Sequence, residues 1–365
     1  MSEERTIENS APEAAHPTRR DVLKHAIAGI GAGGAMALLA CQDQKNDSTP
    51  KGQKGMAASG PKSLRAAIGN GGLQSTWCAL GKTTTELWGK LLNVEVTWFD
   101  GGFNSEKQRS EIERIADQDW DFVAVQSFQI DTLEPAVRKL KRRNTPVISM
   151  DTNLVAPERM REVGVWVQVE PDQQFMGRSS TQYLMEKIGG KGKVIHIGGH
   201  SGHSGAQGRA AGFVEVAAKH PEIEVIGGGV RWCDWEKEKA RSTFEALLNQ
   251  TQEKIAGAFF HSDDMALAAI EALKGTRHEG MIVTAVDGQR EGLTAIKDGR
   301  LAATTVNPVC LIHQWALVIG QFIVRNGEKV EDLPQRIVTP GPLVSRESGN
   351  IDAQFYLADP KHCLV

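Results

Sequence analysis

From residue 64 onward, short apolar runs alternate with longer amphipathic stretches, and this alternation limits the fold more than any other property of the sequence. The short runs are rich in β-branched residues and have the length of buried strands. The longer stretches carry apolar residues at helical spacing. Such an order is typical of β-α units, in which helices cover a mostly parallel sheet. We therefore expect an α/β protein.

The number of strands predicts two doubly wound parallel-sheet lobes joined by a hinge, because about ten strands are too many for one ordinary open sheet. The predicted strands are Leu64–Ile68, Val94–Phe99, Phe122–Gln126, Pro146–Met150, Val165–Val169, Lys193–Ile197, Glu224–Gly227, Ala256–Phe260, Met281–Val286 and Ala302–Val306. The predicted helices between them are Ser105–Asp117, Thr132–Arg143, Asp172–Ile188, Gln207–Lys219, Asp234–Gln250, Asp263–Leu273 and Gly288–Asp298.

The lobe boundaries follow from this partition. We assign residues 62–169 plus 308–336 to an N-terminal lobe and residues 170–307 plus 337–365 to a C-terminal lobe. The chain is expected to cross between the lobes near Val169–Asp172, Asn307–Pro308 and Arg336–Thr339.

Residues 1–41 have the order of an export signal. Arg19 and Arg20 precede an uncharged apolar run at residues 26–40, which is too short to cross a hydrocarbon core of roughly 30 Å but has the length of a signal-peptide apolar segment. The paired arginines resemble a twin-arginine signal, and Leu38-Leu39-Ala40-Cys41 resembles a lipobox, in which Cys41 is acylated. An ordinary buried helix is the alternative. We expect a lipid-anchored protein in the periplasm or at the cell surface, with no other membrane contact.

Residues 42–61 are polar and carry Gly and Pro, so they are expected to form a flexible tether before folding begins near Lys62. The remaining cysteines have scattered spacing, which favours buried free thiols over disulfides. They are Cys78, Cys233, Cys310 and Cys363.

A formal net charge of −3 over 365 residues offers no basic field of the kind that a phosphate backbone requires. Nucleic acid is therefore excluded as the expected partner. Small ligands and other proteins remain.

Polar and aromatic residues follow the predicted strands, where ligands bind in open α/β sheets. These candidate ligand-binding residues are Asn70, Gln74, Trp77, Gln126, Asp151, Arg209, Trp235, Ser262, Asp263, Asp287 and Asn307. Planar polar groups can bind hydroxyls, and aromatic faces can cover aliphatic C–H surfaces, so the set suits a small sugar or polyol. Helix capping by the aspartates and core packing by the tryptophans are the structural alternatives.

Several phrases around these residues together resemble the ribose- and galactose-type periplasmic sugar-binding proteins, the substrate-capturing components of ABC transporters. The phrases are VISMDT, QGRAAGF, DWEKEKA, HSDDMALAAIEAL, VTAVDGQREG and DGRLAATTVNP. The resemblance runs from about Lys62 to the C-terminus. It implies a type I periplasmic binding protein fold, a monomer, an ABC permease as partner, and neither enzymatic activity nor a cofactor.

The resemblance also implies roles for single residues. Asp151 and Asp287 would accept hydrogen bonds from hydroxyls, and Arg209 would donate a forked pair. Trp235 would stack on the ligand, and Asn307 would contribute an amide at a lobe crossing. The stretch from Gln74 to Trp77 and Ser262 depart from the family pattern, so the sugar is not specified.

A signalling receptor and an oxidoreductase are the alternative functions. A receptor that docks on a sensor kinase or chemoreceptor would use the same binding chemistry. An NAD(P)-dependent exported oxidoreductase is suggested by Gly69-Asn70-Gly71, but Gln74 stands where the dinucleotide fingerprint needs a third glycine. His196, His200 and His203 are interrupted by glycines that break a helix, so no metal site is expected.

Overall fold

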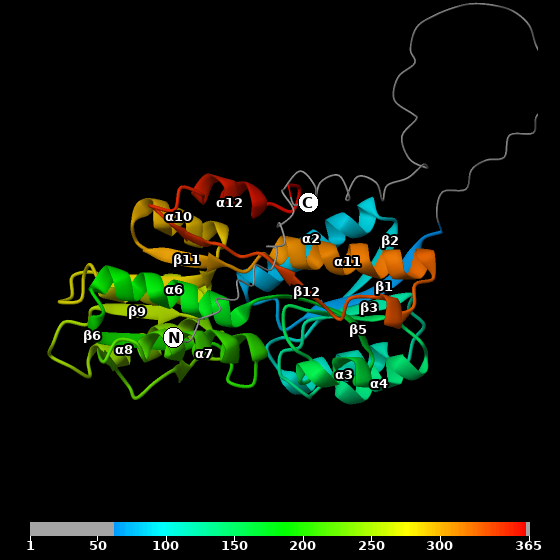
Figure 1. The fold of residues 1–365 in the computed structure, drawn as a ribbon, viewed down its shortest axis with the longest axis horizontal. Helices are drawn as coiled ribbons and strands as arrows, with labels where there is room; N and C mark the ends of the chain where they lie inside the picture. The colour runs from blue at the N-terminus through cyan, green and yellow to red at the C-terminus, as the bar shows by residue number, and fades with distance from the viewer. Residues whose placement is uncertain (1–61, 363–365) are drawn as a thin grey trace, which may run out of the picture. The chain divides into compact units, whose positions relative to one another are not determined.

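A computed structural model describes residues 62–362 of the chain. The expected signal segment with Cys41, the tether at residues 42–61, and Cys363 lie outside the described residues. Residues 62–362 form two lobes, each with a parallel sheet between helices (Figure 1). The predicted fold class is confirmed.

The first lobe contains a six-stranded sheet in the order β12-β5-β4-β3-β1-β2, with every described neighbour parallel. Its central strands read FVAV and VISM and are buried throughout, as expected for a sheet covered on both faces. The elements are β1 (Leu64–Asn70), α2 (Thr76–Leu91), β2 (Val94–Asp100), α3 (Ser105–Ile115), β3 (Phe122–Val125), α4 (Glu134–Arg142), β4 (Val147–Met150), η1 (Pro157–Arg159), α5 (Met160–Val163), β5 (Val165–Pro171), α11 (Val309–Asn326), η3 (Val330–Asp332) and β12 (Arg336–Thr339).

The second lobe contains a seven-stranded sheet in the order β13-β11-β10-β9-β6-β7, and β8 also pairs with β6. Only β13 runs antiparallel to its neighbour among the pairs of this sheet in residues 62–362. The elements are α6 (Gln173–Ile188), β6 (Lys191–Gly198), α7 (Ser204–Ala217), β7 (Glu222–Val225), β8 (Arg231–Trp232), α8 (Lys237–Leu248), β9 (Gly257–Phe260), α9 (Asp263–Ile270), η2 (Glu271–Leu273), β10 (Ile282–Asp287), α10 (Arg290–Asp298), β11 (Ala303–Val306), β13 (Leu343–Ser345) and α12 (Ile351–Leu357).

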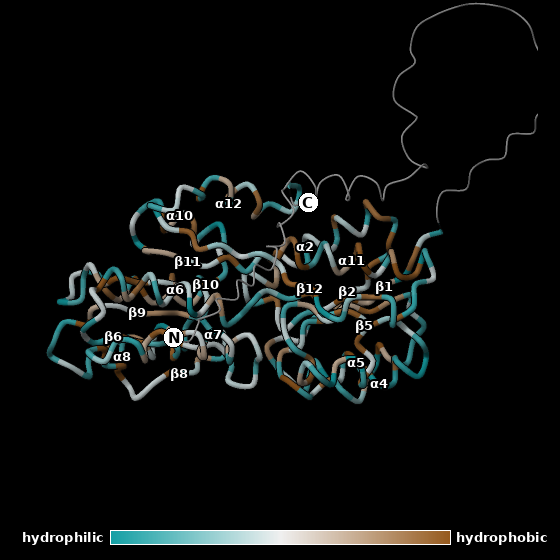
Figure 2. Tube along the Cα trace, in the orientation of Figure 1, coloured by the Kyte–Doolittle hydropathy of each residue, from teal (hydrophilic) through white to brown (hydrophobic). Residues whose placement is uncertain are grey.

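Each sheet has an apolar core on both faces. In the first lobe, α2 and α11 cover one face, and α3, α4 and α5 cover the other. In the second lobe, α6 and α7 cover one face, and α8, α9 and α10 cover the other. Hydrophobic residues accordingly run along the strands and inner helix faces, while peripheral loops are hydrophilic (Figure 2). This arrangement fixes the strands and leaves the loops at their carboxyl ends to build the site.

Three crossings join the lobes. Two fall where they were expected, between β5 and α6 and between β11 and α11. The third lies at Pro340–Pro342 rather than at Arg336–Thr339, because Arg336–Thr339 form β12 and pair with β5 of the first sheet. The first lobe therefore keeps residues up to Pro171 and Thr339, a few residues beyond the expected boundaries.

Cys78, Cys233 and Cys310 are buried free thiols. Within residues 62–362, no helix combines the length and apolar character that crossing a membrane requires.

Candidate functional site

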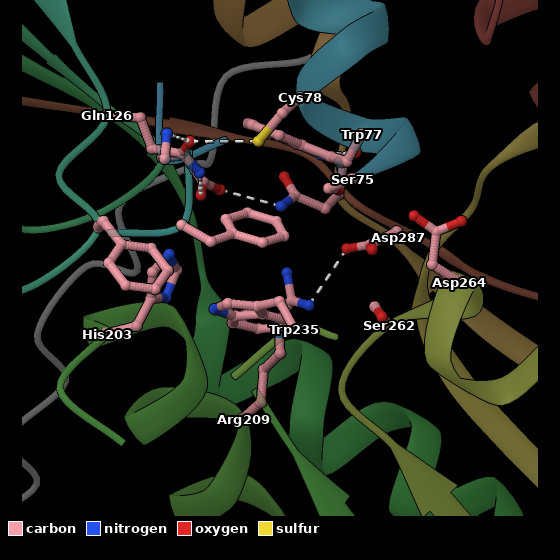
Figure 3. A pocket seen from close by; sticks show the side chains of 15 residues that line it. Ser75, Trp77, Cys78, Gln126, His203, Arg209, Trp235, Ser262, Asp264 and Asp287 are labelled. Carbon is pink, nitrogen blue, oxygen red and sulfur yellow. Dashed lines mark hydrogen bonds and ion pairs between the residues drawn. The ribbon is translucent and has the colours of Figure 1, made fainter. Parts of the chain in front are cut away.

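A pocket lies where loops from both lobes meet. The first lobe contributes Gly71, Ser75, Trp77, Cys78, Phe103, Gln126, Phe128 and Asp151, the second contributes His203, Arg209, Trp235, Ser262, Asp264 and Asp287, and Asn307 comes from a crossing. Figure 3 shows Trp77 and Gln126 facing Arg209 and Trp235 across this space.

Asp151 joins three parts of the molecule. It follows β4 with a φ of +60°, a conformation that non-glycine residues rarely adopt. Its carboxylate accepts hydrogen bonds from Gln126 Nε2 at 2.7 Å, Gln173 Nε2 at 3.0 Å and Asn307 Nδ2 at 2.9 Å. Burial raises the pKa of Asp151, while the charge of Arg209 and the amide donors oppose the shift. The three amides come from the first lobe, the second lobe and a crossing, so this network forms only when the lobes are together.

Asp287 and Arg209 form a buried ion pair with 3.1 Å between Arg209 Nη1 and Asp287 Oδ1 (Figure 3). Their side chains are only 6% and 4% exposed. Arg209 also donates from Nε to Gln173 Oε1 at 2.9 Å and from Nη1 to the His261 carbonyl oxygen. Burial raises the pKa of Asp287, and the neighbouring guanidinium opposes that shift. The pair presents an acceptor and a fixed planar donor to the pocket.

Aromatic rings form the walls. Trp235 lies 5.5 Å from the Arg209 guanidinium carbon and meets the His203 ring edge-on at 5.0 Å between centroids. Phe103 and Phe128 stack on each other at 5.7 Å. Trp77 is held by its Nε1, which donates to the Asn307 carbonyl oxygen at 3.2 Å. These faces suit the C–H surface of a sugar or polyol.

Two buried polar atoms of the pocket lining have no hydrogen-bond partner among the described residues: Trp235 Nε1 and Asn307 Oδ1. A buried polar atom without a partner costs about 1–3 kcal/mol. One atom is a donor and the other an acceptor. A ligand hydroxyl can satisfy either, because it both donates and accepts.

Seven further predicted residues join Asn307 in the pocket lining: Trp77, Gln126, Asp151, Arg209, Trp235, Ser262 and Asp287. The other three lie outside it. Asn70 is buried and donates from Nδ2 to the Cys78 carbonyl oxygen at 2.9 Å, and Gln74 is exposed on the loop before α2.

Asp263 is the third predicted residue that lies outside the pocket lining. It is fully buried and accepts from Thr304 Oγ1 at 2.7 Å and from the Gln289 amide at 2.8 Å, so it joins α9 to β10 and β11. Its neighbour Asp264 lines the pocket instead.

Sequence reasoning missed several residues of the site. Phe103 and Phe128 follow β2 and β3, and Gln173 follows β5. All three follow the carboxyl end of a strand, where ligands bind in such sheets, and their aromatic or amide side chains are of the kind already singled out. His203, on the loop after β6, was interpreted as part of a loop, with a metal site as the alternative.

The histidine loop after β6 serves the pocket and the lobe contact. His200 donates from Nδ1 to Asp234 Oδ1 at 2.8 Å, and its ring stacks on Phe128 of the other lobe at 4.7 Å between centroids. Burial lowers the pKa values of His196 and His203 to about 3, so both rings are neutral at pH 7. Within the described part of the chain, no three His, Cys, Asp or Glu side chains are placed to hold a metal ion.

Two α/β lobes that enclose a polar and aromatic pocket define a hinged ligand-binding protein of the type I periplasmic binding protein fold. Residues 66–328 match the periplasmic binding protein domain, and the chain belongs to this family. It is a binding protein and not an enzyme, which sets aside the oxidoreductase alternative.

Sequence relatives agree with this assignment. A xylitol-binding protein of Mycolicibacterium smegmatis is 26% identical over 285 residues, or 78% of each chain. A ribose import binding protein of Bacillus subtilis is 28% identical over 243 residues, which cover 66% of this chain and 75% of the relative.

Solved structures share the fold. The binding component of an arabinose ABC transporter from Shewanella sp. ANA-3, bound to L-arabinofuranose, superposes with a TM-score of 0.73 at 21% identity and covers 82% of this chain and 97% of its own. A solute-binding protein from Bacillus halodurans with bound myo-inositol gives a TM-score of 0.72 at 17% identity, covering 82% of this chain and 100% of its own.

Proposed function

We propose that the chain is a monomeric extracytoplasmic lipoprotein that captures a small neutral sugar or polyol in the interlobe pocket and delivers it to an ABC permease. The observation that carries this proposal is the convergence of Asp151, Asp287, Arg209 and Trp235 on one pocket built from both lobes. Carboxylates, a guanidinium and an indole face are the groups that bind hydroxyls and C–H surfaces. Relatives named for xylitol and ribose support the same ligand class.

The charges of the pocket favour an uncharged ligand. Three carboxylates line it, from Asp151, Asp264 and Asp287, and the one cation among the lining residues is Arg209. A sugar acid or phosphate would therefore meet an excess of negative charge. A cationic ligand would have to compete with Arg209 and the three amides that already bind Asp287 and Asp151. A neutral hydroxyl meets no repulsion from the carboxylates and does not have to displace Arg209 or the amides.

A thermal-shift screen of the full chain tests the ligand class. The panel is xylitol, D-ribose, L-arabinose, allitol and myo-inositol, with NAD and NADP as controls. We expect stabilisation by at least one of the sugars or polyols and by neither nucleotide, because a ligand that binds only the folded chain raises its melting temperature. Cells that lack the chain should lose uptake of that radiolabelled compound, whereas unaffected uptake would indicate docking on a sensor kinase or chemoreceptor.

Substitutions in the pocket test the site. Asp287→Asn and Arg209→Ala should each weaken binding of the stabilising compound at least 10-fold, or about 1.4 kcal/mol, since a hydrogen bond to a charged group contributes roughly 1.5–3 kcal/mol. Glu238→Gln is the control, because this carboxylate is 78% exposed on the same lobe. Isothermal titration measures the affinities. Unchanged affinity in both pocket variants would show that the ligand binds elsewhere.

A further inference from the structure

At the edge of the pocket, a carboxylate of the second lobe binds the first turn of a helix in the first lobe. The Thr76 backbone N–H donates to Asp264 Oδ2 at 2.8 Å. The Thr76 hydroxyl donates to Asp264 Oδ1, also at 2.8 Å. Both carboxylate oxygens are thus engaged by one residue across the boundary between the lobes.

The N-terminus of α2 lacks a cap of its own. Its N-cap residue Ser75 makes no side-chain capping hydrogen bond, and its first turn holds no acidic residue. The start of a helix carries unpaired N–H groups and a partial positive charge, so a carboxylate there is stabilising. Asp264 supplies that carboxylate from the other lobe. The start of α9, which carries Asp264, opens on the same pocket.

A third residue holds the carboxylate in place. Lys237, at the start of α8, lies with Nζ 3.3 Å from Asp264 Oδ1. The Asp264 side chain is only 10% exposed, so water screens this charge weakly. We call Thr76, Asp264 and Lys237 the interlobe cap. Lys237 and Asp264 share one lobe, so they stay together while Thr76 joins them only on closure.

We propose that the interlobe cap holds the lobes closed over the bound ligand and that Asp264 is a positioning residue for binding. This inference rests on the proposed function. Ser75 and Trp77, which flank Thr76, line the pocket, as does Ser262 beside α9. The cap therefore sets the positions of the lining residues of one lobe relative to those of the other. Because the contact exists only when the lobes are closed, it stabilises the closed state alone and slows ligand release.

Cross-linking tests whether the contact forms in solution. The full chain carrying Thr76→Cys and Asp264→Cys is treated with a short thiol–thiol cross-linker, without ligand and with xylitol, and peptide mapping identifies the product. The control pair is Glu86→Cys with Asp264→Cys. Glu86 lies about 15 Å farther along α2 than Thr76. We expect cross-linking at least 10 times faster than in the control pair. A rate no faster than that of the control pair, both without ligand and with xylitol, would overturn the proposal.

Because the ligand-free chain is included, this outcome does not depend on sugar binding. If the chain cross-links but binds no panel compound, the result supports the interlobe contact and contradicts the proposed function. If the chain binds xylitol but cross-links no faster than the control pair, the result supports the proposed function and contradicts the interlobe cap.

Binding kinetics test the positioning role, with xylitol and D-ribose as probes. Asp264→Ala should raise Kd about 10-fold through faster dissociation, with association little changed. Thr76→Ala should raise Kd less, because it removes the hydroxyl hydrogen bond and keeps the bond from the Thr76 backbone N–H. The double variant should lose no more than Asp264→Ala, because that substitution already removes both hydrogen bonds. Asp264→Asn, which keeps an acceptor for Thr76, should recover part of the loss. A 100-fold loss in the double variant, or a changed preference between the probes, would mean that Asp264 contacts the ligand directly and would overturn the positioning role.

Discussion

Backbone strain is concentrated at residues that line the interlobe pocket. The described residues include eight non-glycine residues with positive φ. Half of them line the pocket: Phe103, Asp151, Trp235 and Asp287. Such conformations cost about 1–3 kcal/mol each and persist where the surrounding structure imposes them, often at binding sites. Asp151, with a φ of +60°, and Asp287, with a φ of +125°, occupy equivalent strand ends in the two lobes, and each contributes a carboxylate to the pocket lining.

The buried carboxyl of Asp263 predicts a pH-dependent stability. Burial raises the pKa of Asp263 to about 7, although hydrogen bonds from Thr304 and Gln289 oppose the shift. A carboxyl with a raised pKa in the folded protein contributes stability that is complete below its unfolded pKa near 3.9 and is lost as the pH rises through about 7. The stability of the wild type relative to Asp263→Asn should therefore fall between about pH 4 and pH 7, by at most about 1.4 kcal/mol per pH unit, and level off above pH 7.

Calorimetry of both proteins at several pH values checks this expectation. The control is Glu238→Gln, whose side chain is exposed and whose difference from the wild type should not change in the same way. A stability of the wild type relative to Asp263→Asn that stays constant, or rises, from pH 4 to pH 7 would contradict the assignment of Asp263 as a buried acid.

The pair Asp263 and Asp264 also shows how far sequence reasoning reaches at a single residue. The start of the helix after β9 was expected to carry ligand-binding polar groups at Ser262 and Asp263, and in the structure Ser262 and Asp264 line the pocket. Successive residues of a helix point about 100° apart, so one carboxylate enters the core and the other faces the pocket. Their order depends on how α9 packs against β10 and β11, which two adjacent aspartates do not reveal. Asn70 and Gln74 were likewise predicted from their positions after a strand, but they do not line the pocket, because side-chain direction depends on packing.

At the level of secondary-structure elements, two glycines bring the backbones of α6 and α7 into contact. A Cβ on Gly177 would lie 2.1 Å from the Arg209 carbonyl oxygen, and one on Gly212 would lie 2.3 Å from the Gln174 carbonyl oxygen. Neither position can hold a side chain unless the helices separate. The hydrogen bond between Gln173 and Arg209 is made by side chains of these two helices. The helix contact therefore places two polar groups of the site.

Gly177→Ala should separate α6 from α7 and destabilise the fold by about 1–3 kcal/mol, the usual cost of overpacking. It should also weaken sugar binding, because Arg209 moves with α7. Chemical denaturation and isothermal titration measure the two effects. The matched control is Ala211→Ser at an exposed position of α7, which should change neither. Stability of Gly177→Ala equal to that of the wild type would contradict the backbone contact.

The elements themselves were predicted well wherever a strand is central and apolar. All ten predicted strands are present, with ends that differ by a few residues. The missed strands are β8, β12 and β13, which are two to four residues long. β12 and β13 end their sheets, and β8 pairs only with β6. Short edge strands lack the continuous buried run that identifies a central strand. For this reason Arg336–Thr339 was interpreted as a crossing, although it pairs with β5.

At the level of the whole molecule, hydrogen bonds join the two lobes beside the pocket. Asp151 in the first lobe binds Gln173 of the second, and the Ile130 and Asn153 amides of the first lobe donate to the Gly202 carbonyl oxygen and the Ser204 hydroxyl. Each half of the pocket is incomplete alone. A ligand that contacts both halves therefore shifts the population toward the closed state. The sequence predicted the two lobes, but not these contacts, because they join loops whose conformations depend on the packing of both lobes.

The proposed anchor places this binding unit at a membrane without involving its pocket. Acyl chains on Cys41 would contribute roughly 0.8 kcal/mol per buried CH₂ group to membrane binding. Residues 42–61 lie between Cys41 and the folded lobes in the sequence. Anchoring and sugar binding should therefore be separable by substitution.

We expect Cys41→Ala to move the chain from the membrane fraction to the soluble extracytoplasmic fraction while its thermal shift with the sugar stays unchanged, because the pocket begins beyond the tether. Ser48→Ala, within the tether, is the control and should remain at the membrane.

Replacing Arg19 and Arg20 by Lys should instead leave the precursor in the cytoplasm, since a twin-arginine signal requires the arginine pair. Fractionation and immunoblotting measure both outcomes. Membrane retention of Cys41→Ala would exclude the lipid anchor, and normal export of the lysine variant would exclude the twin-arginine route.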